Sequence, residues 1–405
     1  MTRIPAYERE PYLQSLQTEI VETGTEGERH FVVLADTVLY PEGGGQPADR
    51  GWIAGMPVEN SLRVEGRIRH YLAGRPPTGQ VQVDLDWTRR FDHMQQHTAQ
   101  HLLTAVAHDR FGWHTTAFHL GEHGSDIELE APSVAPAQLA ALEEAVAAEI
   151  RAARPVTARR VSPEALATLP VRTRGLPEGH LGDIRLVEIA GIDLNTCGGT
   201  HVRSTAEIEA LKLLGTEPLR GGTRLRFVAG GRLRRLLATH HERNARLRQL
   251  VGTSDDELVA GVSARLDQLK EAQRAVRSLE EALAVEAVRA LAASPGKIAS
   301  AHWPSRDLPF LQRMAKEFTH LVPDRIALLT TGEGEQGAFV LCAGEGVTID
   351  LPAAGRQVAE ILSGRGGGSG RIFQGKATHL SRRADALARL RSLVGPDRRV
   401  AGTRD

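Results

Sequence analysis

The sequence of 405 residues predicts a multidomain α+β protein, on three observations. Short strand-like segments separated by glycine-containing turns fill the first part of the chain, and a mixture of helical and strand patterns follows. Apolar residues at seven-residue spacing then lead into a second alternation of strands and helices. We expect a small β-barrel (1–88), a mixed α+β domain (89–231), an antiparallel coiled-coil hairpin (232–296) and an α/β domain (297–405).

The composition limits the classes of protein that this chain belongs to. Lys plus Arg and Asp plus Glu both number 50, so the formal net charge is zero, which argues against a nucleic-acid-binding coat over the whole surface. Positive charge is concentrated in two segments. Residues 220–235 hold six arginines and no acid, and residues 365–405 hold ten Arg or Lys against three Asp, a net of +7.

Only two cysteines are present, Cys197 and Cys342, which excludes a disulfide scaffold and suits a reducing compartment. The N-terminal residues lack the apolar core of a signal peptide, and no apolar run approaches the length of a membrane span. The sequence therefore predicts a cytoplasmic protein with no membrane partner. Cys342 follows apolar residues and is expected to be a buried thiol.

Each expected domain has its own local signals. In the barrel, residues 31–34 and 81–85 are rich in β-formers, and Gly43 to Gly45 break the pattern. In the second domain, a helix starting near Phe91 and capped by Asp92 carries His97 and His101, and a proline-initiated helix spans 136–153. Strands are expected at 184–187 and 225–228.

The helical hairpin is expected to have one arm at 232–251 and a second arm that starts at a capping box, Ser254 to Glu257, and runs unbroken to about Ser294. Val262, Leu269, Val276 and Leu283 recur every seven residues and form a coiled-coil seam. We prefer the interpretation in which the hairpin is a rigid spacer and its two arms pack against each other. The alternative is that the apolar seam joins two copies of the chain in a dimer.

The C-terminal domain is expected to hold buried strands at 326–329 and 339–342 and a helix at 353–362. Residues 364–371 read as a flexible basic loop, either a disordered glycine linker or a phosphate-binding nest, and they do not fit a P-loop. Basic residues in and after this loop favour a polyanion as its partner. They are Arg365, Arg371, Lys376, Arg382 and Arg383.

Two half-sites carry the chemistry. His97 and His101 are four positions apart, so on a helix both imidazoles project from one face. Cys197 and His201 flank a Gly-Gly turn that can bring a thiolate and an imidazole together. Three imidazoles and one thiolate suit zinc best, so we expect one Zn²⁺ per chain.

These motifs resemble a known family. His97-Thr-Ala-Gln-His101-Leu-Leu with Cys197-Gly-Gly-Thr-His201-Val resembles the editing domain of alanyl-tRNA synthetases and free-standing AlaX proteins. Residues 36–47, Asp-Thr-Val-Leu-Tyr-Pro-Glu-Gly-Gly-Gly-Gln-Pro, resemble the glycine-rich motif of the preceding barrel, and residues 366–377 resemble the DHHA1-type domain. Together they resemble the long AlaX type of alanyl-tRNA editing protein, with an α+β editing core and an α/β DHHA1-like C-terminal domain.

The resemblance implies an aminoacyl-tRNA deacylase that acts in trans for translational fidelity. It would hydrolyse the ester of tRNA(Ala) mischarged with serine or glycine and spare alanyl-tRNA(Ala). Because the chain begins at the barrel, it is expected not to charge tRNA itself. The DHHA1-like domain is expected to bind tRNA or to form a homodimer together with the coiled coil.

The resemblance also assigns roles to individual residues. His97, His101, Cys197 and His201 would bind zinc. Zinc would either activate a water molecule or position the amino acid, and the full set of four protein ligands favours positioning. The expected tRNA contacts are Arg365, Gly366, Gly367, Gly368, Arg371, Lys376, Arg382 and Arg383.

Four further residues are candidates for substrate recognition. Gln46 is expected to donate a hydrogen bond to the ester or the amino acid. Thr115 and Thr116 are candidates for pairing with a seryl hydroxyl, with Thr116 preferred, and Thr37 is a weaker third. Other histidines are expected to be structural or at the surface, namely His93, His114, His119, His123 and His180.

Two other functions compete with this interpretation. The first is a tRNA-binding or assembly module whose metal is purely structural. The second is a zinc hydrolase of small esters, for which a long arm and a basic tail would have no use.

Overall fold

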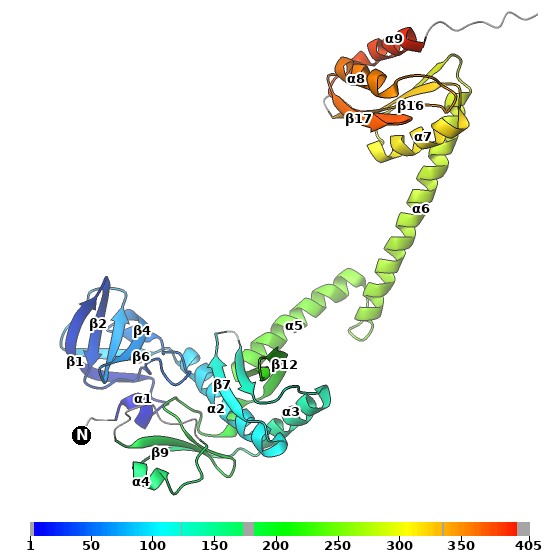
Figure 1. The fold of residues 1–405 in the computed structure, drawn as a ribbon. Coiled ribbons are helices and arrows are strands. Elements are labelled where there is room, and N and C mark those ends of the chain that lie inside the picture. The colour runs from blue at the N-terminus through cyan, green and yellow to red at the C-terminus, as the bar shows by residue number, and fades with distance from the viewer. Residues whose placement is uncertain (1–3, 123, 173–181, 334–335, 395–405) are drawn as a thin grey trace, which may run out of the picture. The chain divides into compact units, whose positions relative to one another are not determined.

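The computed structural model describes residues 4–122, 124–172, 182–333 and 336–394, and its fold is drawn in Figure 1. The chain divides into two compact units, residues 1–246 and 247–405, and each is described by itself. His123, His180 and residues 395–405 of the expected C-terminal domain lie outside the described residues. Within the described ranges, no helix combines the length and the apolar character needed to cross a membrane.

Unit 1 begins with the short helix α1 (Ala6–Arg9) and a closed barrel of six strands in the order β1-β2-β5-β4-β3-β6 (Figure 1). The strands are β1 (Ser15–Glu26), β2 (Arg29–Leu34), β3 (Gly51–Ile53), β4 (Met56–Val64), β5 (Arg67–Leu72) and β6 (Gln80–Leu85). In β6 the apolar residues Val81, Val83 and Leu85 alternate with more exposed polar ones, which is the pattern of a strand with one face on a core. The predicted β-barrel is confirmed.

The long helix α2 (Trp87–Phe111) follows the barrel directly. Asp86 is its N-cap, and its carboxylate accepts a hydrogen bond from the backbone N–H of Arg89 at 3.1 Å. The predicted start near Phe91, with Asp92 as the cap, is therefore wrong. Asp92 lies in the second turn, where the backbone N–H groups are already paired, and its carboxylate bonds Arg232 at 2.8 Å instead.

The rest of unit 1 surrounds α2. Strands β12, β13, β8 and β7 form an antiparallel sheet in that order, and β11, β10 and β9 form a second sheet. The remaining elements are β7 (Thr115–Leu120), β8 (Ser125–Leu129), α3 (Pro136–Arg151), β9 (Val156–Val161), α4 (Pro163–Leu166), β10 (Ile184–Ile189), β11 (Asp193–Thr196), η1 (Thr205–Ile208), β12 (Leu211–Leu219), β13 (Gly222–Ala229) and α5 (Gly230–Val251).

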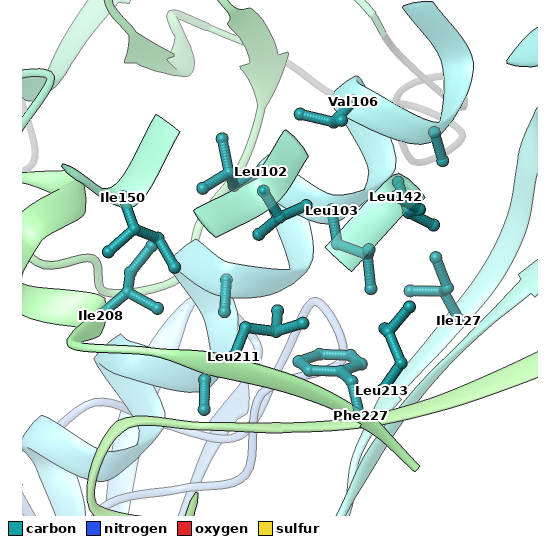
Figure 2. Close-up of a cluster of buried hydrophobic side chains, with 14 of the residues drawn as sticks. Leu102, Leu103, Val106, Ile127, Leu142, Ile150, Ile208, Leu211, Leu213 and Phe227 are labelled. Atoms are coloured by element: carbon teal, nitrogen blue, oxygen red, sulfur yellow. The ribbon is translucent and has the colours of Figure 1, made fainter. Parts of the chain in front are cut away.

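One hydrophobic core holds these elements together. Leu102 and Leu103 of α2, Leu142 of α3 and Phe227 of β13 are fully buried in it, and Figure 2 shows them among their neighbours. Burying each such side chain contributes about 1.5–3 kcal/mol, so this cluster fixes α2 against the larger sheet. The histidine-bearing face of α2 is thereby fixed as well.

A buried ion pair joins the barrel to α2. Arg90 of α2 and Asp49 of the barrel are both fully buried, and Arg90 Nε donates to Asp49 Oδ2 at 2.9 Å. The guanidinium also donates to the carbonyl oxygens of Pro11 at 2.9 Å and Val38 at 2.6 Å. Asp49 in turn accepts from the backbone N–H of Tyr40 at 2.7 Å. A buried charge is tolerated when it is paired as fully as this.

Unit 2 holds a five-stranded sheet in the order β14-β15-β16-β18-β17, parallel only between β14 and β15. Its elements are α6 (Leu258–Ala292), β14 (Ile298–Trp303), α7 (Leu308–Leu321), β15 (Ile326–Thr331), β16 (Gly337–Ala343), α8 (Leu351–Ile361), β17 (Arg365–Ser369), β18 (Ile372–Ala377), η2 (Leu380–Arg382) and α9 (Arg383–Val394). Helix α7 and the end of α6 cover one face, and α8 and α9 cover the other.

The interior strand β15 explains why residues 326–329 have the apolar sequence of a buried strand. Ile326 and Leu328 point into the core with α8, whereas Ala327 and Leu329 point into the core with α7. A strand covered on both faces is apolar over most of its length, and here only the two buried threonines at the end of β15 depart from that pattern. Cys342 is fully buried in β16, as predicted, and burial raises the pKa of its thiol to about 12.

The two expected helices of the hairpin are present as α5 and α6, and Gly252 follows α5 with a φ of +77°. The predicted capping box is wrong: α6 begins at Leu258 with Glu257 as its N-cap, and the hydroxyl of Ser254 bonds the side chain of Glu257 instead of a backbone N–H. On α6 the seam residues Val262, Leu269 and Val276 are exposed, so unit 2 itself does not cover them. The pairing of the seam in a coiled coil stays a prediction.

The glycine-rich segment is not a flexible loop, and that prediction is wrong. Residues 365–369 form the edge strand β17, which pairs with β18 so that Gly366 lies opposite Gly375. A Cβ atom on Gly366 would lie 2.3 Å from the carbonyl oxygen of Gln374. Glycine therefore serves here as the residue that lets two backbones approach closely.

We predict that Asp49→Ala lowers the free energy of unfolding of unit 1 by about 3–5 kcal/mol, because it leaves the Arg90 charge buried and unpaired. Urea unfolding followed by circular dichroism would measure the change. The matched control is Glu144→Ala, which breaks an exposed ion pair with Arg151 and is expected to change stability by less than about 1 kcal/mol. Equal effects of the two substitutions would contradict the prediction.

Candidate metal centre

Four side chains from two distant segments meet in the interior of unit 1. Helix α2 presents His97 and His101 on one face, and the loop after β11 presents Cys197 and His201. One ligand atom of each lies within 4.8 Å of all the others. Cys197 Sγ is 3.4 Å from His97 Nε2 and 3.3 Å from His201 Nε2. The structure thus brings together the four residues that the two half-sites predicted.

The other nitrogen of each imidazole is held by a separate partner. His97 Nδ1 is 2.9 Å from Gln46 Oε1, His101 Nδ1 is 3.0 Å from Asp193 Oδ2, and His201 Nδ1 is 3.1 Å from Thr98 Oγ1. Carbonyl, carboxylate and hydroxyl oxygens at Nδ1 direct each Nε2 toward the centre of the cluster. Such outer partners are a regular feature of metal-binding histidines.

The charges in the cluster are strongly coupled. Burial alone would raise the pKa of the Cys197 thiol, but the surrounding imidazoles outweigh burial and lower it well below its usual value. Burial opposes protonation of His101, but the Cys197 thiolate and Asp193 raise its pKa to about 9. Burial and His97 lower the pKa of His201 to about 3. A metal ion that binds here must therefore displace a proton from His101, so its affinity rises with pH.

The donor set fits a metal ion of borderline softness. One thiolate and three imidazoles converge in a buried pocket, and the outer nitrogens are already satisfied. This set is compatible with zinc in tetrahedral coordination. The described residues contain one other group of this kind, His119 with Asp126 and Glu128, and there Arg224 pairs with the two carboxylates.

The loop that carries Cys197 is positioned by hydrogen bonds to its backbone. Arg185 donates to the carbonyl oxygens of Cys197 at 2.7 Å and Gly199 at 2.8 Å. Gln46 Oε1 accepts from the backbone N–H of Thr200 at 3.0 Å, and Gln46 Nε2 donates to the hydroxyl of the same threonine at 2.9 Å. Gln46 is buried, and its amide links the barrel to both halves of the cluster.

The three threonine candidates lie in different environments. Thr115 is half-buried and lines a cavity, and its hydroxyl donates to Thr104 Oγ1 at 3.2 Å. Thr116 is exposed, and its hydroxyl bonds the carbonyl oxygen of Glu128 at 3.3 Å. The hydroxyl of Thr37 is buried in the barrel, where it accepts from the N–H of Leu39 at 3.1 Å. This placement favours Thr115 over Thr116.

A cavity of about 300 Å³ lies against α2, and none of the four clustered ligands is among its lining residues. Gln100, Thr104 and His108 continue the face that carries His97 and His101, since residues three and four apart share one side of a helix. The full lining is Gln100, Thr104, His108, His114, Thr115, Val171, Arg172 and Asn195.

His93 is buried but does not belong to the cluster, and burial lowers its pKa to about 3. It is a neutral residue of the interior, as expected for a structural role. His119 is exposed and pairs with Asp126 at 2.9 Å, and His114 is exposed at the rim of the cavity.

Sequence reasoning missed the residues that orient the ligands. Thr98 lies inside the His-x3-His motif, and its hydroxyl bonds the ring of His201. It follows His97 on the helix and is turned about 100° from it, so a threonine at this position could have been considered as a hydrogen-bond partner for a ligand of the second half-site. Asp193 lies four residues before Cys197, but nothing local pairs it with His101, which is 92 residues away. The role of Arg185 could not be recognised from the sequence, because it depends on the pairing of β10 with β11 that brings Arg185 beside the loop.

The predicted tRNA-binding residues are spread over unit 2: residues 365–376 lie on or between β17 and β18 at one edge of the sheet, whereas Arg383 bonds Ser300 of β14 at the opposite edge. Arg365 and Lys376 are opposite each other on β17 and β18. Arg371 bonds the carbonyl oxygen of Glu345 at 2.6 Å, Arg382 pairs with Asp385 at 3.2 Å, and Arg383 bonds the hydroxyl of Ser300. In the part of the chain that the structure describes, Arg365 and Lys376 form no ion pair and no side-chain hydrogen bond, whereas the guanidinium of Arg371 is held by backbone carbonyl oxygens.

The chain is similar to known proteins both in one domain and over most of its length. Residues 184–226, which include Cys197 and His201, match the family described as threonyl and alanyl tRNA synthetase second additional domain. The chain is 40% identical over 367 residues to the alanyl-tRNA editing protein Aarsd1 of Mus musculus, covering 90% of this chain and 88% of that protein. It is 31% identical over 396 residues to the alanyl-tRNA editing protein AlaX-L of Pyrococcus horikoshii, covering 91% and 93%. The chain belongs to the family of alanyl-tRNA editing proteins, which confirms the resemblance.

Among solved structures, the C-Ala domain from Aquifex aeolicus alanyl-tRNA synthetase aligns with 24% of this chain and 91% of that domain. The identity is 16% and the TM-score is 0.24, a likeness too loose to bear on the fold.

The loop also offers a matched pair of substitutions. A Cβ atom on Gly199 would lie 2.2 Å from His97 Cε1 and 2.8 Å from Gln46 Oε1, whereas one on Gly198 meets nothing within 4 Å. We predict that Gly199→Ala displaces His97 and weakens zinc binding by about 10- to 100-fold, as loss of an outer partner does. Gly198→Ala is the control and is expected to bind zinc like the wild type. Competition with a chromophoric chelator would measure both, and equal affinities would contradict the close packing of Gly199 against His97.

Proposed function

We propose that this chain is a zinc-dependent hydrolase that acts in trans on tRNA(Ala) mischarged with serine or glycine. Water adds to the carbonyl carbon of the aminoacyl ester, the bond to the ribose oxygen breaks, and the free amino acid and tRNA are released. Alanyl-tRNA(Ala) is spared. The observation that carries the proposal is the cluster of His97, His101, Cys197 and His201, in a chain of the alanyl-tRNA editing family.

One Zn²⁺ per chain would be held by these four side chains. When bound, it supplies a positive charge that holds and polarises the aminoacyl group. The side chains around the ligands would fix how the metal ion is held. Asp193 and Thr98 hold the outer nitrogens of His101 and His201, so these imidazoles are presented in one tautomer and one orientation.

Gln46 is best described as a positioning residue in this proposal. Its carbonyl oxygen holds His97, and one of its two amide N–H groups donates to Thr200. The second N–H group of the amide is the one proposed to donate to the ester or the amino acid. Thr115, half-buried in the wall of the cavity against α2, is the threonine that we propose for contact with the amino acid.

Contact with tRNA is proposed for the edge of the sheet in unit 2. Arg365 and Lys376 face each other across β17 and β18, where like charges repel unless an anion lies between or beside them. The glycine strand between Arg365 and Arg371 is exposed throughout and presents backbone beside these cations. Phosphate groups of a nucleic acid satisfy both features.

The direct test is release of serine from seryl-tRNA(Ala), with alanyl-tRNA(Ala) as the substrate to be spared. We expect rapid serine release by the wild type. Cys197→Ala should lower kcat/KM by more than about 100-fold, since loss of a ligand exceeds the effect of losing an outer partner. Cys342→Ala removes the other cysteine, which is buried in unit 2 and far along the chain, and is expected to retain the activity.

Three outcomes would contradict the proposal. Zinc-loaded wild type that releases no serine would leave a binding module with a structural metal. Equal hydrolysis of a small seryl ester and of seryl-tRNA(Ala) would indicate a small-ester hydrolase. Retained activity in Cys197→Ala would remove the cluster from the reaction.

We predict that Arg365→Gln combined with Lys376→Gln weakens binding of tRNA(Ala) and makes the slope of log affinity against log salt shallower by about 2. Arg274→Gln combined with Arg277→Gln removes the same charge from the exposed surface of α6 and is the control. Filter binding at several salt concentrations would measure both. A control as weak as the test pair would mean that net charge alone is responsible.

A further inference from the structure

Residues 220–235 form one of the two segments in which the sequence concentrates positive charge, but the fold neutralises most of it. Five of the six arginines in this segment are held in ion pairs with acidic side chains. The pairs are Arg224 with Asp126 and Glu128, Arg226 with Glu217, Arg234 with Glu209, and Arg232 and Arg235 with Asp92. This segment therefore stabilises unit 1 more than it offers charge to a partner.

Free positive charge lies further along α5. This helix holds six arginines and a single acid, Glu242. Arg243 and Arg246 are exposed, and they form no ion pair and no side-chain hydrogen bond with the residues that the structure describes. Residues three and four apart share one side of a helix, so these two arginines continue a stripe that begins with Arg235 and Thr239. The stripe starts in an ion pair and ends in two unpaired cations.

The first turn of α5 is fixed to the helix that carries the metal ligands. Gln96 of α2, which directly precedes His97, accepts from the backbone N–H of Ala229 at 3.0 Å and donates to its carbonyl oxygen at 2.9 Å. Gln95 Oε1 accepts from the backbone N–H of Gly231 at 3.0 Å. The position of the stripe relative to the metal centre is therefore set by the packing of unit 1.

The place and the chemistry of the two unpaired arginines suit a polyanion. At 1.5 Å per residue, Arg243 and Arg246 lie about 20–24 Å along α5 from its first residue, Gly230. A tRNA whose ester is held at the centre brings its unpaired 3′ end and the first base pairs of its acceptor arm over the surface of unit 1. Every nucleotide carries a phosphate, and guanidinium groups bind phosphate oxygens through parallel N–H groups.

We propose that the exposed stripe of α5 binds the phosphate backbone of the tRNA acceptor arm through the guanidinium groups of Arg243 and Arg246. This inference rests on the proposed function, which supplies the RNA partner. It gives unit 1 a tRNA contact of its own, separate from the sheet edge of unit 2. Because α5 is fixed to α2, the contact orients the acceptor arm with respect to the metal centre as well as adding affinity.

The first experiment measures binding of uncharged tRNA(Ala) to the full chain by filter binding between 50 and 200 mM salt. We expect Arg243→Gln combined with Arg246→Gln to make the slope of log affinity against log salt shallower by about 2 and to weaken binding by about 10-fold at the lower salt concentration. Arg243→Lys combined with Arg246→Lys keeps both charges and is expected to retain the slope of the wild type.

The second experiment measures serine release from a seryl minihelix that contains the acceptor arm alone. The double glutamine variant is expected to lose about 10-fold in kcat/KM. Arg151→Gln combined with Arg159→Gln is the control, because it removes the same charge from another exposed part of unit 1, and it is expected to change kcat/KM by less than about 2-fold. Zinc content and thermal unfolding of all variants are expected to match the wild type.

The outcomes separate this inference from the proposed function. A wild type that releases no serine overturns the proposed function, whereas binding of uncharged tRNA(Ala) still decides the role of α5. Unchanged affinity and slope in the double glutamine variant overturn the inference alone, and so does a control that loses as much as the test pair. Weaker binding of tRNA(Ala) with full activity on the minihelix places the contact outside the acceptor arm and overturns the inference as well.

Discussion

The metal centre depends on one buried ion pair, Arg90 with Asp49. Both side chains are withdrawn from water, so the pair is stable only while every partner of the guanidinium is in place. These partners belong to the barrel and the segment before it, whereas Arg90 belongs to α2. The pair therefore fixes the glycine-rich turn that carries Gln46 against the helix that carries His97, two turns further along. A small displacement between barrel and helix would separate Gln46 from His97.

The three histidine rings of the centre are also held by hydrogen bonds from separate parts of unit 1. Gln46 comes from the barrel, Thr98 from α2 and Asp193 from the smaller sheet, and each holds one histidine. The centre thus lies where the barrel, α2 and the smaller sheet meet, and the positions of its ligands depend on how these three elements pack. Precise placement of ligands by rigid elements is what a hydrolytic site requires, since small displacements of reacting groups reduce rates strongly.

Local patterns were sufficient for features that depend on neighbours in the sequence. His97 and His101 were predictable from helical periodicity, and the barrel strands from their alternation. Features set by distant packing were not. Asp92 was misread because its partner Arg232 lies 140 residues away, and Asp193 was overlooked for the same kind of reason. The glycine-rich edge was misread because its strand exists only through β18, and glycine alone has little strand preference.

The spread of the centre along the sequence has a consequence for synthesis of the protein. Gln46 and Thr200 are 154 residues apart and share two hydrogen bonds. While the ribosome is still making residues 112–196, the barrel and α2 are available to pack, but the thiol and the third imidazole do not yet exist. Binding of a metal ion by all four side chains therefore becomes possible only after residues 197–201 have been made and have left the ribosome, which places completion of the centre late in the folding of unit 1.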